Sequence, residues 1–131
     1  MILDTNFYIK FCLEPDEKLL KLIVDKTITA PDFLKLEVIN ILRKLHFFNG
    51  VPREKIDEYE AMIWGLVNEF VPDKILLDLT KKISFQLNHP IYDCIFLALA
   101  LETNDVFCSY DQRLITKAVT IGIKTIDLTT L

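Results

Sequence analysis

Four acidic residues occupy places in the chain from which carboxylates could act together. They are Asp4, Glu37, Asp93 and Asp111. Neighbouring carboxylates repel one another and raise each other's pKa unless a cation joins them. Their hard oxygen atoms are ligands that Mg²⁺ and Mn²⁺ accept readily. If the fold brings these side chains together, the sequence predicts a divalent metal site.

Each acid also has a purely structural explanation when it is taken alone. Asp4 and Asp111 could cap helices, and Asp93 could complement a helix dipole. Glu37 could point to solvent from the flank of its helix. Convergence of the four side chains is therefore what would indicate chemistry, and it depends on the elements that carry them.

Strands and helices are expected to alternate along the chain. Short β-prone runs predict strands at residues 1–3, 27–30, 106–109 and 124–128, with a further short strand at 70–71. Apolar spacing predicts helices at 31–48, 56–70, from 73 onward, 91–101 and 112–121. This alternation predicts an α/β fold, a single domain over residues 1–131 with a mainly parallel central sheet flanked by helices on both faces.

Such a sheet places its ligand site beyond the carboxyl ends of its strands. Asp4 and Asp111 directly follow predicted strands. Glu37 falls in the second turn of the helix at 31–48, and Asp93 in the first turn of the helix at 91–101. We therefore expect the four acids to meet at this edge.

Composition limits the classes of protein that the chain could be. Its 131 residues suit one domain, and 51% hydrophobic with 26% charged residues is typical of a folded globular protein. The longest apolar run, 94–101, is too short to span a bilayer, and no secretory signal pattern opens the chain, so we expect a cytoplasmic protein without a membrane segment. Its three cysteines are widely spaced, which predicts reduced core thiols.

The formal charge of −4 argues against a protein that binds nucleic acid through a general basic surface. That argument weakens if the four acids are gathered at one metal site, because the rest of the chain would then carry no net formal charge.

Four ordered blocks, spread over almost the whole chain, resemble the PIN-domain family. They are Ile-Leu-Asp-Thr-Asn at 2–6, Ala-Pro-Asp-Phe-Leu-Lys-Leu-Glu-Val-Ile-Asn at 30–40, His-Pro-Ile-Tyr-Asp-Cys-Ile-Phe-Leu-Ala-Leu-Ala at 89–100 and Val-Phe-Cys-Ser-Tyr-Asp-Gln-Arg-Leu at 106–114. Each block supplies one of the four acids. The resemblance implies an endoribonuclease that hydrolyses RNA phosphodiester bonds with Mg²⁺ or Mn²⁺. It also implies that all four acids are catalytic metal ligands, with Asp111 completing the site.

Further residues are expected to bind substrate or to support the acids. They are Asn6, Asn40, Ser109, Arg43 and Arg113. The family more often has threonine where this chain has Ser109, and Asn40 matches a frequent polar partner of the family, although a solvated helix residue explains it equally well. The arginines, together with Lys44, are candidates to hold phosphate because the three glycines form no phosphate-binding loop; ordinary surface charge is the alternative.

Both histidines are left out of the expected site. His46 lies outside the four blocks, and His89 is explained as the residue before a proline that begins a helix.

Two other functions compete with an active nuclease, and a third role, as an interaction surface, is compatible with catalysis. A phosphatase of the haloacid dehalogenase type would need a second aspartate two residues after Asp4, where this chain has Asn6. A catalytically inactive PIN fold that acts as a binding module would have lost acids that are all present here. Surplus apolar side chains predict an interaction surface. They are Leu36, Ile39, Phe47, Met62 and Trp64.

The chain is short, and it is similar to the toxin half of a VapBC-type toxin and antitoxin pair. That resemblance implies a homodimer and a small antitoxin partner. A housekeeping RNA-processing nuclease is the alternative, and the sequence does not reveal which RNA is cut.

Overall fold

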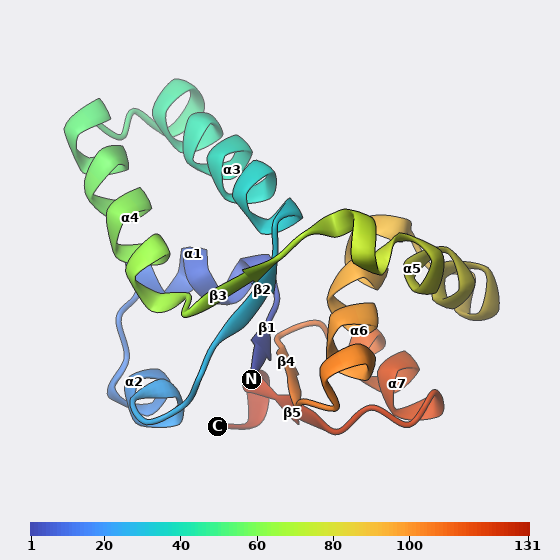
Figure 1. The fold of residues 1–131 in the computed structure, drawn as a ribbon. Helices are drawn as coiled ribbons and strands as arrows, with labels where there is room; N and C mark the ends of the chain where they lie inside the picture. The colour runs from blue at the N-terminus through green and yellow to red at the C-terminus, as the bar shows by residue number, and fades with distance from the viewer.

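A computed structural model describes all 131 residues of the chain and contains five short strands (Figure 1). They are β1 (Ile2–Leu3), β2 (Thr29–Pro31), β3 (Glu69–Val71), β4 (Phe107–Ser109) and β5 (Thr125–Asp127). All five predicted strands exist. The second begins later than expected, because the N–H of Ile28 donates to the side chain of Asn68 (2.7 Å) instead of to a neighbouring strand.

Every strand pairing is parallel. β1, β4 and β5 form one sheet in the order β1-β4-β5, and β2 pairs with β3 in a second. The two sheets meet where the N–H of Thr29 in β2 donates to the carbonyl of Met1 beside β1 (3.2 Å). Chain order therefore changes direction next to β1, and the carboxyl end of β1 is the place where such sheets bind ligands.

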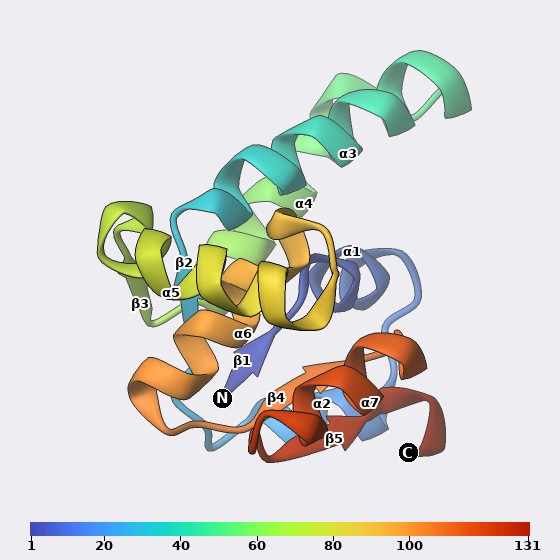
Figure 2. The same cartoon turned by 90° about the vertical axis from the view of Figure 1, so that its right-hand side faces the viewer.

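Seven α-helices and a short 3₁₀ helix surround these strands on both sides (Figures 1 and 2). They are α1 (Thr5–Leu13), α2 (Glu17–Ile23), α3 (Phe33–Asn49), α4 (Arg53–Leu66), α5 (Asp73–Leu87), α6 (Ile91–Thr103), α7 (Gln112–Thr120) and η1 (Leu128–Thr130). The predicted α/β class, one domain with a parallel sheet among helices, is confirmed.

Several helix boundaries differ from the sequence-based expectation, and two of the differences have a clear cause. Pro31 belongs to β2, where it lies opposite Val71, so α3 begins only at Phe33. The helix expected at 56–70 ends at Leu66 because Val67 has an extended backbone and Phe70 joins β3 beside β2.

Helix α6 lies at the centre of the domain. All seven residues Cys94–Ala100 are buried, and the helix packs against β1, β2, β4 and α5. An apolar segment with no polar face can be stable only in such a position. The three cysteines are buried and unpaired. None of the helices combines the length and the apolar composition that crossing a membrane requires.

Helices α3 and α4 form a hairpin that extends away from the strands (Figure 1). Gly50 ends α3 with a φ of 70°, a left-handed conformation in which glycine carries no steric cost. Leu36, Ile39 and Phe47 are exposed along this hairpin. Trp64 was expected to belong to this exposed apolar surface, but it is half-buried. Its ring packs edge-on against that of Phe70, with the ring centroids 6.0 Å apart.

Candidate functional site

Three of the four acids line one small cavity beside the carboxyl end of β1. Its volume is about 90 Å³. Asp4 follows β1, Glu37 comes from α3, and Asp93 comes from the first turn of α6. The complete lining is Asp4, Thr5, Asn6, Glu37, Ile41, Asp93 and Phe96. Segments far apart in the chain therefore bring carboxylates to the edge at which the fold predicts a ligand.

Asp4 is the most enclosed of these acids, with 8% of its surface exposed. Its Oδ1 accepts a hydrogen bond from the N–H of Phe7 (3.4 Å) and so caps α1. Its Oδ2 accepts a short hydrogen bond from the hydroxyl of Ser109, which ends the neighbouring strand β4. The capping explanation is thus correct for one oxygen, while the other is held by the adjacent strand.

Electrostatics disfavour a negative charge on Asp4. Burial raises the pKa of its carboxyl to about 6, although the hydrogen bonds from Ser109 and Phe7 act in the opposite direction. The charges of Asp93 and Asp111 raise the pKa further. No lysine or arginine forms an ion pair with Asp4. A charge buried in this way is costly to the folded protein unless a cation accompanies it.

Glu37 shares this environment. Burial raises the pKa of its carboxyl, a hydrogen bond from Thr5 lowers it, and the charge of Asp93 raises it. The hydroxyl of Thr5 donates to Oε1 of Glu37 at 2.6 Å and connects α1 to α3. Thr5 was not among the expected site residues, although its place next to Asp4 in the opening block could have indicated it.

Asp93 is held by a residue that the sequence interpretation left out. Nε2 of His89 lies 2.7 Å from Oδ2 of Asp93, and Nζ of Lys117 lies 2.9 Å from Nδ1 of the same imidazole. His89 lies directly before the N-cap residue Pro90, and Asp93 lies in the first turn of α6, so their short separation in the sequence was a usable signal. No sequence pattern pointed to Lys117, which lies in α7.

Asp111 does not line the cavity. Its Oδ1 accepts the N–H groups of Arg113 (3.0 Å) and Leu114 (3.1 Å), so it caps α7. Its own N–H donates to the hydroxyl of Ser109 (2.9 Å), which in turn donates to Asp4. Asp111 is therefore linked to the cavity through Ser109, and its role as a metal ligand stays a prediction.

The other expected residues fall in different places. Asn6 lines the acid cavity, and Asn40 lines an adjacent hollow of about 330 Å³ together with Glu37. Arg113 is exposed at the start of α7. Arg43 lies elsewhere, over the ring of Phe47 at 5.0 Å from its centroid.

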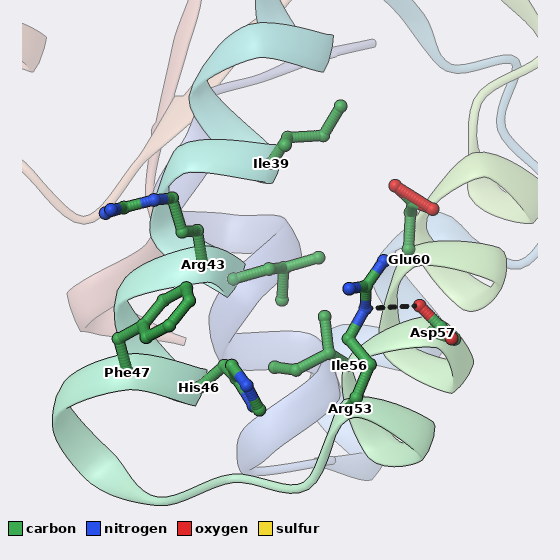
Figure 3. Close-up of a pocket in the computed structure, with 9 residues that line it drawn as sticks. Ile39, Arg43, His46, Phe47, Arg53, Ile56, Asp57 and Glu60 are labelled. Atoms are coloured by element: carbon green, nitrogen blue, oxygen red, sulfur yellow. Dashed lines mark hydrogen bonds and ion pairs between the residues drawn. The ribbon is translucent and has the colours of Figure 1, made fainter.

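Arg43 lines a separate cavity between α3 and α4 (Figure 3). This cavity has a volume of about 240 Å³ and contains none of the four acids. An ion pair between Arg53 and Asp57 (3.3 Å) lies at its edge, and Ile39 and Ile56 contribute apolar surface. The larger cavity and the acid cavity are thus different features of the molecule.

The donor chemistry of the acid cavity suits a hard cation, because its potential ligands are carboxylate and amide oxygens. The carboxylates are not yet arranged as a coordination sphere: no group of three or more His, Cys, Asp or Glu side chains is placed to hold a metal ion. Each acid instead accepts a hydrogen bond from its own neighbour, namely Ser109, Thr5 or His89. The residues that line the cavity are nevertheless of the type that divalent cations bind.

Comparisons with known proteins agree on the fold. The family described as PIN domain matches residues 1–119 of this chain. The chain is similar to the structure of PAE2754 from Pyrobaculum aerophilum, with a TM-score of 0.72 and 16% identity over 98% of this chain and 91% of that one. It is also similar to FitAcB from Neisseria gonorrhoeae, with a TM-score of 0.66 and 14% identity over 99% of both chains. No curated protein sequence gives a significant match.

Proposed function

Because this chain belongs to the PIN-domain family, we propose that it is an endoribonuclease that uses Mg²⁺ or Mn²⁺ at a site formed by Asp4, Glu37 and Asp93. PIN domains are generally nucleases that use divalent metal ions. One observation carries the proposal: these three carboxylates line a single cavity, and Asp4 is buried there without a cationic partner. A fold optimised only for stability would not gather like charges in this way.

The polar network around the cavity would hold the acids for this chemistry. When bound, a divalent cation would neutralise charge on the scissile phosphate and lower the pKa of an attacking water. Ser109 would keep Asp4 oriented, and Thr5 would do the same for Glu37. The backbone N–H of Asp111 would fix the hydroxyl of Ser109 and so act on Asp4. Fixed ligands reduce the reorganisation that the reaction requires.

We propose that an RNA strand binds along two neighbouring hollows. One shares Glu37 with the acid cavity, and the stacked rings of Phe33 and Tyr92 line it, with centroids 5.5 Å apart. The other, of about 470 Å³, shares Asn6 with the acid cavity and contains Lys10. Aromatic faces stack on unpaired bases, and lysine contacts phosphate. We therefore take single-stranded or locally unpaired RNA as the substrate class.

The exposed apolar side chains of the α3–α4 hairpin support a protein-binding role alongside catalysis. Together with the similarity of the fold to FitAcB, they lead us to propose a VapC-type toxin that has a second copy of itself and a small antitoxin as partners and the cytoplasm as its compartment. A housekeeping RNA-processing nuclease would show the same cleavage without an antitoxin. An inactive binding module would show the surface without cleavage.

Cleavage of a mixed RNA pool tests the assignment. We expect wild-type protein to cut RNA with Mg²⁺ or Mn²⁺ and not with EDTA, and Asp4→Asn to lose more than about 100-fold in rate, because loss of a ligand carboxylate weakens binding of the metal ion. Asp78→Asn is the matched control, since it makes the same chemical change at an exposed position on α5. Equal cutting by wild type and Asp4→Asn, or cutting that survives EDTA, would refute the assignment.

Co-purification with the product of the adjacent reading frame separates the toxin from the processing enzyme. A small protein that binds the chain and suppresses cutting supports the toxin. Undiminished cutting in the presence of every neighbouring gene product favours the processing nuclease.

A further inference from the structure

A lysine and a histidine form a hydrogen-bonded chain that ends on Asp93. Nζ of Lys117 lies 2.9 Å from Nδ1 of His89, and Nε2 of His89 lies 2.7 Å from Oδ2 of Asp93. The three residues come from α7, from the turn between α5 and α6, and from α6. Neither Lys117 nor His89 lines the acid cavity. These two residues therefore contact Asp93, which lines the cavity, from outside the cavity lining.

The chemistry of the donors determines how the imidazole is protonated. A lysine ammonium group has three hydrogen-bond donors and no acceptor. Nδ1 of His89 must then accept from Lys117 through its lone pair, and the ring proton lies on Nε2. Nε2–H consequently donates to Oδ2 of Asp93. The geometry thus selects one tautomer of His89 and gives the hydrogen bond to Asp93 a fixed direction.

The surroundings of His89 hold the ring in place. Only 11% of its side chain is exposed. Its carbonyl accepts hydrogen bonds from the hydroxyl of Ser84 (2.6 Å) and the thiol of Cys94 (3.6 Å). Pro90 follows and restricts the backbone where α6 begins. A ring held through both its backbone and its two nitrogens can orient the carboxylate that it contacts.

We infer that His89 and Lys117 are positioning residues for Asp93 in the proposed metal site. The inference rests on the proposed function and extends it to two residues outside the cavity lining. Oδ2 of Asp93 is occupied by His89, whereas Oδ1 has no hydrogen bond within the protein and stays available to a cation. Asp4 and Glu37 receive hydroxyl donors from Ser109 and Thr5, and the imidazole is the corresponding support for Asp93.

The simpler role of these contacts would be a purely structural one, in which a clasp, meaning the Lys117–His89–Asp93 contact, only stabilises the packing of α7 against α6. A clasp would contribute to stability and leave the affinity for metal ions unchanged. A positioning role predicts that the affinity for metal ions falls in variants that still fold, because partners that orient a ligand typically change metal affinity about 10- to 100-fold. The two roles are therefore separated by binding measurements on folded variants.

The tautomer can be measured on the metal-free wild-type protein by nitrogen NMR of isotope-labelled histidine. The chain has two histidines, and His46 provides an internal reference. Nδ1 of His46 lies 2.8 Å from the carbonyl of Val51, which can only accept, so His46 must carry its proton on Nδ1. We expect opposite tautomers for the two rings. A proton on Nδ1 of His89 would overturn the inference.

Metal affinity provides the second test, by following free Mn²⁺ with electron paramagnetic resonance. We expect Lys117→Met and His89→Leu to weaken Mn²⁺ binding about 10- to 100-fold, and Lys117→Arg and His89→Gln, which keep an N–H donor, to recover part of the loss. Lys82→Met, which removes an exposed lysine from α5, is the matched control and should bind as wild type does. Circular dichroism establishes that each variant compared is folded.

Each outcome leads to a different conclusion. Folded Lys117→Met that binds Mn²⁺ as tightly as wild type, while Asp4→Asn has lost binding, would overturn the positioning role and leave the proposed function intact. Wild-type protein that binds no Mn²⁺ would overturn the proposed function and this inference together. Weakened binding in Lys117→Met with normal binding in Lys82→Met supports the positioning role.

Discussion

The acid cavity and the α3–α4 hairpin depart from stable packing in opposite ways. In the cavity, Asp4 is only 8% exposed and its carboxylate has no cationic partner. On the hairpin, Leu36 and Phe47 are 67% and 65% exposed, although apolar side chains are favoured inside. One region therefore buries charge and the other exposes apolar surface. Both features reduce the stability of the isolated chain.

The comparison shows which kind of partner each region needs. A cation would offset the repulsion among the acids. The exposure of the apolar side chains to water would be removed only by a partner with an apolar surface of its own. The supporting structure differs accordingly. Hydrogen bonds from Ser109, Thr5 and His89 fix the carboxylates. On the hairpin, the exposed ring of Phe47 is contacted by Arg43 and His46 of its own helix. Catalysis requires fixed groups, while a binding surface tolerates movement before its partner arrives.

Matched substitutions at two phenylalanines should give the largest difference in stability between these regions. Phe96 is 1% exposed and lines the acid cavity, whereas Phe47 is exposed on α3. We expect Phe96→Ala to lower the free energy of unfolding by about 3–5 kcal/mol, because it leaves a void in the core. Phe47→Ala should change it by less than about 0.5 kcal/mol. Urea unfolding followed by circular dichroism measures both, and similar values would remove the distinction.

A pH titration of stability addresses the buried charge next. Asp4 has a pKa of about 6 in the folded protein against an ordinary value of 3.8, so the folded state binds this proton more tightly than the unfolded state does. The stability that the folded protein gains from binding this proton is fully present below about pH 4 and is lost as the pH rises toward about 6. Relative to metal-free Asp4→Asn, wild type should lose up to about 3 kcal/mol across this range. A constant difference between the two proteins would contradict the raised pKa.

Self-association should give the smallest of these effects. Ile39 and Phe47 are exposed on α3 and line the cavity in the hairpin (Figure 3). If the hairpin joins two copies of the chain, replacing both residues by serine should weaken dimerisation by at least about tenfold, or about 1.4 kcal/mol. Sedimentation equilibrium at several concentrations measures this. A wild-type protein that stays monomeric throughout would exclude the hairpin as a homodimer surface.

The fold was predictable because its elements follow simple patterns. Residues 91–101 are apolar on nearly every face, which indicated the central helix, and Asn49 with Gly50 indicated the end of α3. Helices α1 and α2 were not located in advance, since short helices rely on packing more than on an extended apolar stripe. Strand ends were located less exactly, because they depend on tertiary contacts such as the hydrogen bond from Ile28 to the side chain of Asn68.

The candidate site was only partly predictable. Asp4, Glu37 and Asp93 could be chosen because each had a definite place relative to a strand or helix. Lys117 could not, because its contact with His89 joins residues 28 apart through a tertiary arrangement that no local pattern encodes. The cap that Asp111 forms on α7 was among the structural explanations considered, whereas its link to Asp4 through Ser109 had no sequence signal.

Unfolding of wild type and Asp4→Asn, each with EDTA and with excess Mn²⁺ near neutral pH, tests most directly whether the buried acids form a cation site. In EDTA we expect Asp4→Asn to be the more stable protein, because it lacks a carboxylate charge that burial disfavours and that Asp93 and Asp111 repel. Mn²⁺ at about 100 times its dissociation constant should stabilise wild type by about 2.7 kcal/mol and Asp4→Asn far less, so that the order of stability reverses. Equal stabilisation of both proteins by Mn²⁺, or a less stable Asp4→Asn in EDTA, would contradict the assignment of these carboxylates to a metal site.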